Sequence, residues 1–206
     1  EAPNDVAVLR LVGSDWKEVT CAQYLEEVKG VAKGLIAKGV KTGDRVVIMS
    51  HTRYEWSLIA WAVWSVGGVT VPIYETSSSD QCDWILTDSG ATVAVAENDE
   101  LAGVLTGSTD WKGDVLVIEN NLVDELTAAG ADVSDADLET ASLTAGHEDT
   151  CAIIYTSGTT GRPKGVIHTY GNLIANHRAQ LLELELNQAD RIRELTDRVH
   201  DIEMQT

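Results

Sequence analysis

Several residue types and patterns are scarce or missing in this chain of 206 residues, and each absence narrows what the protein can be. The sequence has no run of eighteen apolar residues and no signal-peptide layout at its start, so we expect neither a membrane-spanning helix nor export. The three cysteines, Cys21, Cys82 and Cys151, are far apart and form no CxxC pair. This spacing argues against a zinc site and favours core thiols in a reducing cytosol. Phe is absent although Trp occurs six times, and nothing in the sequence explains that bias.

Cations are almost missing from the middle of the chain. Residues 80–149 hold seventeen Asp and Glu against the single base Lys112, a balance of 1 − 17 = −16. The other residues carry sixteen acids and fourteen bases, a balance of 14 − 16 = −2, so the two parts give the total of −18. An acidic surface repels phosphate backbones and anionic headgroups, so we expect no nucleic-acid binding. The acidic stretch is interpreted as solvated surface.

The first part of the chain shows two local patterns. Residues 6–20 alternate apolar and polar side chains around residues 13–15, which predicts a β-hairpin. Thr20 followed by Gln23 three residues later is a capping box that opens a helix, and Gly39 ends this helix. The apolar residues expected on its inner face are Leu25, Val28, Val31, Ala32, Leu35 and Ile36.

Five short apolar runs follow, separated by helical segments. Strands are expected at 45–50, 69–74, 91–97, 114–119 and 150–156, and helices at 55–66, 80–87, 99–106 and 121–143. Such an alternation indicates crossover connections between parallel strands. We therefore predict an α/β fold: a mostly parallel sheet with flanking helices, an N-terminal hairpin and a C-terminal amphipathic helix. Sheets of this kind bind ligands in loops at the carboxyl ends of their strands.

The predicted C-terminal helix occupies residues 187–206. Its apolar stripe is formed by Ile192, Leu195, Val199 and Ile202, with charged residues elsewhere. The stripe is too short to indicate a coiled coil by itself. The helix is expected to pack on its own domain, and self-association through the stripe, or through an uncovered sheet edge, is the alternative.

A polar loop follows the last predicted strand. Its residues are Thr156, Ser157, Gly158, Thr159, Thr160, Gly161, Arg162, Pro163, Lys164 and Gly165. Glycines let the backbone approach a ligand closely, hydroxyls and free amides donate hydrogen bonds, and a lysine supplies a mobile charge for phosphate oxygens. The loop is not a Walker A motif, which needs GxxxxGK followed by Ser or Thr. We interpret it as a cradle for a polyphosphate, with a hairpin loop of no chemical role as the alternative.

The eleven residues Thr156–Val166, TSGTTGRPKGV, resemble the phosphate-binding signature of the adenylate-forming (AMP-binding) superfamily, which includes acyl-CoA synthetases, peptide-synthetase adenylation domains and luciferases. Residues 45–97 resemble the long-chain fatty acyl-CoA synthetases in particular, and VPIYETSS at 71–78 is the most specific piece. The resemblance covers about residues 15–180. It implies that a carboxylic acid attacks the α-phosphate of Mg-ATP to give an acyl-adenylate, from which coenzyme A then displaces AMP.

The resemblance also implies roles for the loop residues. Lys164 would be the catalytic residue, neutralising the departing pyrophosphate. The nucleotide-binding residues would be Thr156, Ser157, Gly158, Thr159, Thr160, Gly161 and Gly165, the hydroxyls as donors and the glycines for shape. Tyr170 stands where the family often has His, and His168 and His177 are expected to flank a helix or lie at the core edge.

Other segments of the family's pattern are not found in these 206 residues. They are the DRxLxFLPLAH segment that shapes the acyl and adenine pockets, the YGxTE segment with its magnesium-binding Glu, the ribose-binding Asp and the C-terminal domain with its lysine. We therefore name no metal ligand, and acyl-chain length cannot be read. We expect residues 1–186 to be a partial N-terminal AMP-binding domain and residues 187–206 to be an unrelated tail.

Two classes of function remain open at this point. The first is a fatty acid–CoA ligase fragment with little or no turnover, acting on a fatty acid and ATP, cytoplasmic or peripherally attached to a membrane. The second is a catalytically silent interaction protein that associates through its tail. A kinase is disfavoured, because the sequence has no Walker A, no GxGxxG followed by an acidic residue, and no HRD segment.

Overall fold

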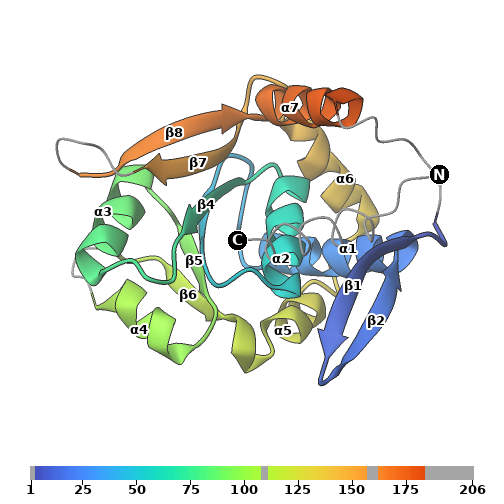
Figure 1. Ribbon diagram of the computed structural model, residues 1–206, viewed down its shortest axis with the longest axis horizontal. Coiled ribbons are helices and arrows are strands. Elements are labelled where there is room, and N and C mark those ends of the chain that lie inside the picture. The colour runs from blue at the N-terminus through green and yellow to red at the C-terminus, as the bar shows by residue number, and fades with distance from the viewer. Residues whose placement is uncertain (1–2, 108–110, 157–161, 184–206) are drawn as a thin grey trace, which may run out of the picture. The chain divides into compact units, whose positions relative to one another are not determined.

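The computed structural model describes residues 3–107, 111–156 and 162–183 (Figure 1). Two compact units are present: the described residues of the first are 3–26 and 173–183, and those of the second lie between residues 27 and 172. No helix within the described residues is long and apolar enough to cross a membrane. The predicted tail at 187–206, and with it the expected boundary at residue 186, lies outside the described residues.

The smaller unit contains the predicted hairpin. Strands β1 (Val6–Val12) and β2 (Asp15–Thr20) are antiparallel, and Val12 pairs with Asp15 across a two-residue turn. Gly13 adopts a φ of 65° there, a conformation that favours glycine. The unit also holds the start of helix α1 (Cys21–Ala37) and most of helix α7 (Tyr170–Glu183).

The predicted capping box opens α1. The backbone N–H of Thr20 donates to Gln23 Oε1 at 2.9 Å, and the backbone N–H of Gln23 donates to Thr20 Oγ1 at 3.2 Å. Both bonds satisfy donors that the first helical turn leaves unpaired. Of the expected inner face of α1, Val28, Val31, Ala32 and Leu35 are buried, whereas Leu25 is half exposed.

The larger unit is built on a six-stranded sheet. Its strands are β3 (Arg45–Met49), β4 (Val69–Ile73), β5 (Val93–Ala96), β6 (Asp114–Val117), β7 (Thr150–Thr156) and β8 (Lys164–Thr169). The spatial order is β6-β5-β3-β4-β7-β8. Every neighbouring pair is parallel except β7 and β8, which are antiparallel. The prediction of a mostly parallel sheet is confirmed.

Strand β8 was not predicted. The expected strands ended at residue 156, but after the polar loop the chain returns along β7 for six residues, and α7 begins at Tyr170. The glycines and hydroxyls of the loop break the hydrophobic pattern, so the return strand has no periodicity that continues from β7.

Helices connect the strands and cover both faces of the sheet. They are α2 (Tyr54–Ser65), α3 (Ser79–Ser89), α4 (Asp99–Thr106), α5 (Leu122–Ala129) and α6 (Asp135–Thr144), with a short 3-10 helix at Ile118–Asn120. Figure 1 shows α3 and α4 on one side of the sheet and α2 and α5 on the other. The helical stretch expected at 121–143 consists of two helices, because Gly130 ends α5 and Ser134 caps α6 with its own capping box.

The core on the α3 side places alternate residues of each strand against the two helices. Val47 and Met49 of β3 lie in the same cluster as Cys82 and Leu86 of α3 and Leu105 of α4. Burying apolar surface in this way is the main favourable term in folding. Burial also raises the pKa of the Cys82 thiol to about 11.

The prediction of core thiols holds for two of the three cysteines. Cys82 and Cys151 are buried, but Cys21 is exposed. Cys21 is the first residue of α1 and precedes the buried part of that helix, which begins at Val28.

Candidate functional site

The polar loop joins the carboxyl end of β7 to the start of β8. Thr156, the last residue of β7, pairs with Lys164, the first residue of β8. Both are exposed. The predicted site residues Ser157, Gly158, Thr159, Thr160 and Gly161 lie outside the described residues. A hydroxyl and an ammonium group therefore flank the loop at its two ends.

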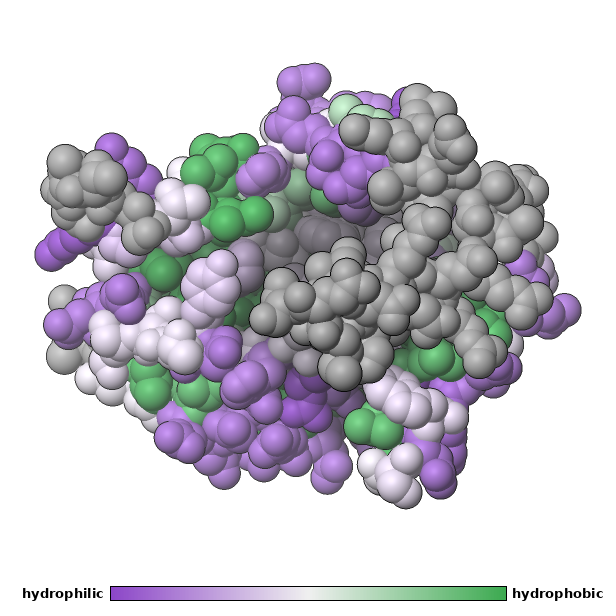
Figure 2. Space-filling model, viewed as in Figure 1, coloured by the Kyte–Doolittle hydropathy of each residue, from purple (hydrophilic) through white to green (hydrophobic). Residues whose placement is uncertain are grey.

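The sheet face beneath these two residues is apolar. Directly opposed residues of an antiparallel pair share a face, and every second residue of a strand returns to it. Ile154 and Val166 are paired in this way and follow Thr156 and Lys164 on the same face. They are 42% and 44% exposed, and Figure 2 shows hydrophobic surface over the region of β7 and β8.

Gly165 permits close packing on the other face of the hairpin. A Cβ at this position would lie 2.8 Å from Cγ2 of Ile153 and 3.2 Å from the ring of Tyr155, its cross-strand partner. Both distances are shorter than a side chain tolerates without displacing its neighbours. A glycine thus lets the Tyr155 ring lie against the backbone of β8.

Helix α3 holds both strands next to the loop. The indole N–H of Trp84 donates a 2.9 Å hydrogen bond to the carbonyl oxygen of Pro163, and the guanidinium carbon of Arg162 lies 4.5 Å from the centre of the Trp84 ring. The hydroxyl of Tyr155 donates to Oδ2 of Asp88 at 2.6 Å. Burial, with the nearby Asp88 carboxylate, raises the pKa of Tyr155 above its usual value. No sequence pattern predicted the hydrogen bonds from Trp84 and Tyr155, which join residues 79 and 67 positions apart.

The position where the family often has His is structural here. Tyr170 begins α7, and its hydroxyl lies 3.1 Å from the carbonyl oxygen of Gly68 and 3.3 Å from that of Trp64. Burial raises the pKa of Tyr170 to about 12. His168 is half-buried on β8, and His177 is exposed on α7.

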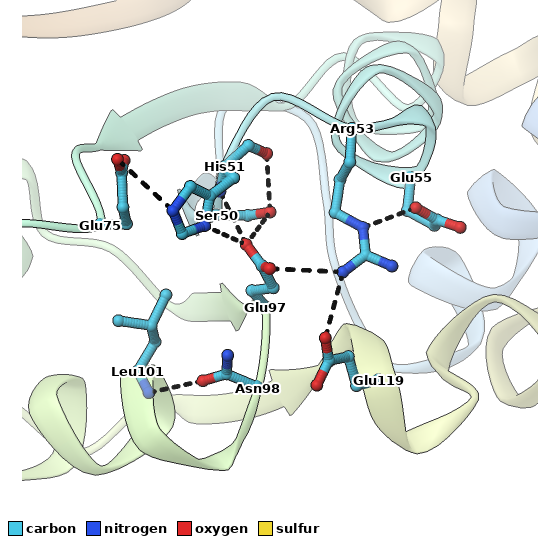
Figure 3. Close-up of polar contacts among 9 residues, drawn as sticks. All are labelled: Ser50, His51, Arg53, Glu55, Glu75, Glu97, Asn98, Leu101 and Glu119. Carbon is cyan, nitrogen blue, oxygen red and sulfur yellow. Dashed lines mark hydrogen bonds and ion pairs between the residues drawn. The ribbon is translucent and has the colours of Figure 1, made fainter. Parts of the chain in front are cut away.

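A second polar cluster lies at the carboxyl ends of β3 and β5 (Figure 3). Oε2 of Glu97 accepts hydrogen bonds from the backbone N–H of His51 at 2.8 Å and from the hydroxyl of Ser50 at 3.1 Å. Nδ1 of His51 lies 2.9 Å from the same oxygen, and its Nε2 lies 3.7 Å from Oε1 of Glu75. Sequence analysis did not single out this cluster, although polar residues directly after two buried strands were the available signal.

The cluster holds more acidic than basic groups, because four carboxylates lie against the guanidinium of Arg53 and the ring of His51. Arg53 lies 2.7 Å from Glu55, 3.6 Å from Glu97 and 3.5 Å from Glu119. The hydrogen bond to Glu97 raises the pKa of His51. Burial favours the neutral carboxyl of Glu97, but the bonds from His51 and Ser50 outweigh it and lower the pKa of Glu97. In the part of the chain that the structure describes, no group of three His, Cys, Asp or Glu side chains could hold a metal ion. We interpret the cluster as a set of contacts that hold the carboxyl ends of β3 and β5 together.

The polar loop is thus the candidate site. The family described as AMP-binding enzyme matches residues 1–206. The chain belongs to the AMP-binding enzyme family. The resemblance drawn from the loop and from residues 45–97 is confirmed.

Several individual proteins are similar to this chain. It is 47% identical over 178 residues to the long-chain-fatty-acid--CoA ligase FadD15 of Mycobacterium bovis, covering 84% of this chain and 30% of FadD15. The fatty acyl-adenylate ligase of L. pneumophila, solved with acyl adenylate and pyrophosphate, superposes with a TM-score of 0.69 at 23% identity over 90% of this chain and 31% of that protein. ATP-bound MatB of Rhodopseudomonas palustris superposes with a TM-score of 0.66 at 27% identity, over 86% of this chain and 35% of MatB.

The match to FadD15 has a definite extent. The chain spans about 30% of the length of FadD15. The family match over residues 1–206 includes the polar loop and its two flanking strands. The solved relatives share the sheet and helices of this chain at the level of the fold.

Proposed function

We propose that this chain is the phosphate-loop portion of an enzyme that activates a long-chain fatty acid with ATP, first to the acyl-adenylate and then to acyl-CoA. Support comes from the 47% identity to a protein that bears the name long-chain-fatty-acid--CoA ligase. The family's complete loop signature at residues 156–166 supports the use of ATP. The same proposal leaves the 206 residues alone with little or no turnover, because they match 30% of that relative.

The proposed reaction has two steps. A carboxylate oxygen of the fatty acid attacks the α-phosphorus of ATP, the bond between that phosphorus and its bridging oxygen breaks, and pyrophosphate leaves. The sulfur of coenzyme A, having lost its proton, then attacks the acyl carbonyl carbon and AMP leaves. Negative charge grows on the pyrophosphate oxygens in the first step, so a cation placed beside them lowers the barrier.

The observation that carries the proposal is the placement of Thr156 and Lys164. They face each other across the first ladder position of the β7–β8 hairpin, at the two ends of the loop. In this arrangement the Lys164 ammonium meets the β- and γ-phosphates that the loop amides and the hydroxyls of Ser157, Thr159 and Thr160 bind. The acidic chain otherwise repels an anion, which makes the cations of the loop, Arg162 among them, decisive for polyphosphate binding.

Magnesium and coenzyme A belong to the proposal only in outline. No carboxylate group suited to a metal is found among the described residues, so we assign Mg²⁺ no ligand and propose that it enters bound to ATP. When bound, Mg²⁺ neutralises the charge of the triphosphate oxygens. Coenzyme A is proposed as the second substrate from the family alone.

Calorimetric titration of the chain with inorganic pyrophosphate tests the assignment. We expect saturable binding with one site, weakened at least about tenfold by Lys164→Ala through the loss of a charge-assisted contact. Lys17→Ala is the matched control, because it removes one exposed lysine from the hairpin strand β2 and changes the net charge equally. Equal binding by Lys164→Ala and the unchanged chain would reject the site and favour a catalytically silent interaction protein.

A further inference from the structure

We propose that Trp84 is a positioning residue of the phosphate loop, which it holds from helix α3. This inference rests on the proposed function. Trp84 makes both contacts that the structure describes between α3 and residues 162–163: its indole N–H donates to the Pro163 carbonyl at 2.9 Å, and its ring lies 4.5 Å from the Arg162 guanidinium carbon.

Helix α3 is a firm base for such contacts. A capping box at Ser78 and Gln81 opens the helix, and Gly90 closes it in the left-handed conformation with a φ of 62°. Its inner residues Cys82 and Leu86 are fully buried in the core cluster of β3, β4 and β5. Close-packed side chains of this kind resist displacement, so a group fixed to α3 is fixed to the sheet.

The hydrogen bond acts on the peptide unit that leads into Lys164. The carbonyl of Pro163 and the backbone N–H of Lys164 belong to one planar peptide group, so fixing the carbonyl also fixes the direction in which Lys164 leaves the loop. Pro163 restricts its own φ as well. From Lys164 onward the ladder with Thr156 takes over. Trp84 therefore fixes Pro163, the residue directly before β8 and before the predicted catalytic Lys164.

The ring of Trp84 makes a second contribution. A guanidinium over an indole face is attracted by the negative charge of the ring surface. This contact holds Arg162 at the Pro163 end of the loop although its side chain is exposed. A fixed cation near Lys164 raises the local positive potential. Because the Arg162 side chain is already held in place, it does not have to be ordered when the polyphosphate binds.

The test separates positioning from ordinary packing, because three tryptophans make the same kind of bond. The indole N–H groups of Trp64 and Trp111 also donate to backbone carbonyls, those of Cys151 at 2.9 Å and Ala91 at 2.6 Å. Trp111 precedes β6, on the amino-end side of the sheet, whereas the loop follows the carboxyl end of β7. Trp111→Phe thus loses an equivalent bond far along the strands from the loop and serves as the matched control.

We expect Trp84→Phe to raise the Kd for inorganic pyrophosphate about fivefold, the effect of one lost hydrogen bond. Trp84→Leu, which also loses the aromatic face under Arg162, should raise it about tenfold or more. The Kd of Trp111→Phe for pyrophosphate should stay within about twofold of that of the unchanged chain, although this variant should lower the urea unfolding midpoint as much as Trp84→Phe does. Unchanged binding by Trp84→Phe, or equal losses in Trp84→Phe and Trp111→Phe, would overturn the inference.

The outcome is distinguishable from failure of the proposed function. If the unchanged chain shows no Lys164-dependent pyrophosphate binding, the function fails first. Should Trp84→Phe not fold, the unchanged chain still decides by nuclear magnetic resonance. We expect pyrophosphate to shift the indole N–H signal of Trp84 and to leave that of Trp111 in place; a stationary Trp84 signal at saturating pyrophosphate would contradict the inference.

Discussion

A single carboxylate oxygen, Oε2 of Glu97, lies 2.8 Å from the backbone nitrogen of His51 and 2.9 Å from its ring Nδ1. The pair connects the end of β5 to the end of β3. The strand order of the sheet reverses between these two strands, because the chain continues from β3 to β4 on one side and from β5 to β6 on the other. Open α/β sheets form a crevice at such a point. Here protein side chains bridge it, and the candidate site lies two strands away, after β7.

The His51–Glu97 pair makes stability depend on pH. Because the pKa of His51 is raised above 6.5 in the folded chain, its proton is held more tightly there than in the unfolded chain. The contribution is complete below the unfolded pKa and is lost as the pH rises through the raised value of the folded chain. Urea midpoints measured from about pH 6 to about pH 8.5 should fall for the unchanged chain and fall less for His51→Gln.

The charged neighbours of His51 set the controls. Glu75 and Glu97 both favour the protonated ring of His51. Nη1 of Arg53 lies 3.6 Å from Oε1 of Glu97. Glu97→Gln should therefore flatten the same part of the profile as His51→Gln. His177→Gln, an exposed position on α7, should retain the slope of the unchanged chain. Identical slopes in all four proteins would show that the pair does not couple to folding.

Helices α1 and α5 touch through glycine. A Cβ on Gly34 would collide with the carbonyl oxygen of Leu126, and one on Gly130 would lie 2.5 Å from the backbone nitrogen of Gly34. Gly34→Ala should therefore destabilise the chain by about 1–3 kcal/mol through overpacking. Gly103→Ala is the control, because nothing lies within 4 Å of its Cβ position inside α4. It should stabilise by about 0.5–1 kcal/mol through helix propensity, so urea unfolding should move the two variants in opposite directions.

The sequence allowed the parallel strands to be predicted to within a few residues. Buried strands such as β3 and β5 consist of short continuous apolar runs, which few other structures explain. Turn and cap residues marked boundaries equally well: Thr20 opens α1 through its side chain, as the capping pattern predicted. Local rules worked wherever a residue's neighbours in sequence are also its physical partners.

The features that were not predicted depend on residues far apart in the sequence or on interrupted hydrophobic patterns. Strand β8 finds its ladder only by folding back across the loop, and Gly130 breaks a helix because α1 approaches there. Trp84 lies 79 residues from the Pro163 carbonyl that it contacts, and Glu97 lies 46 residues from His51. No spacing rule links such pairs. The loop signature predicted a candidate site, but the contacts of Trp84 with residues 162–163 could be found only from the fold.

The bond between Tyr155 and Asp88 should stabilise the loop end of β7. Tyr155→Phe and Asp88→Asn each weaken a 2.6 Å hydrogen bond to a carboxylate that water also reaches, so we expect about 1 kcal/mol of destabilisation from each. The double variant should lose little more than either single one, because both changes remove the same interaction. Urea unfolding of the four proteins measures this coupling; strictly additive losses would show that the contact contributes nothing in solution.

Carboxylate-dependent exchange of labelled pyrophosphate into ATP asks whether the chain can also form an adenylate. We expect no exchange above the Lys164→Ala background with fatty acids of any length, even when calorimetry shows pyrophosphate bound. Positioning and charge stabilisation supply nearly all the rate in phosphoryl-type chemistry, and the proposed function assigns only the phosphate-binding part of that arrangement to this chain. Full-length FadD15 is the positive control. Exchange by this chain that depends on acyl length and disappears in Lys164→Ala would mean that its 206 residues build an acyl pocket of their own, and the proposal of a silent phosphate-loop portion would then be wrong.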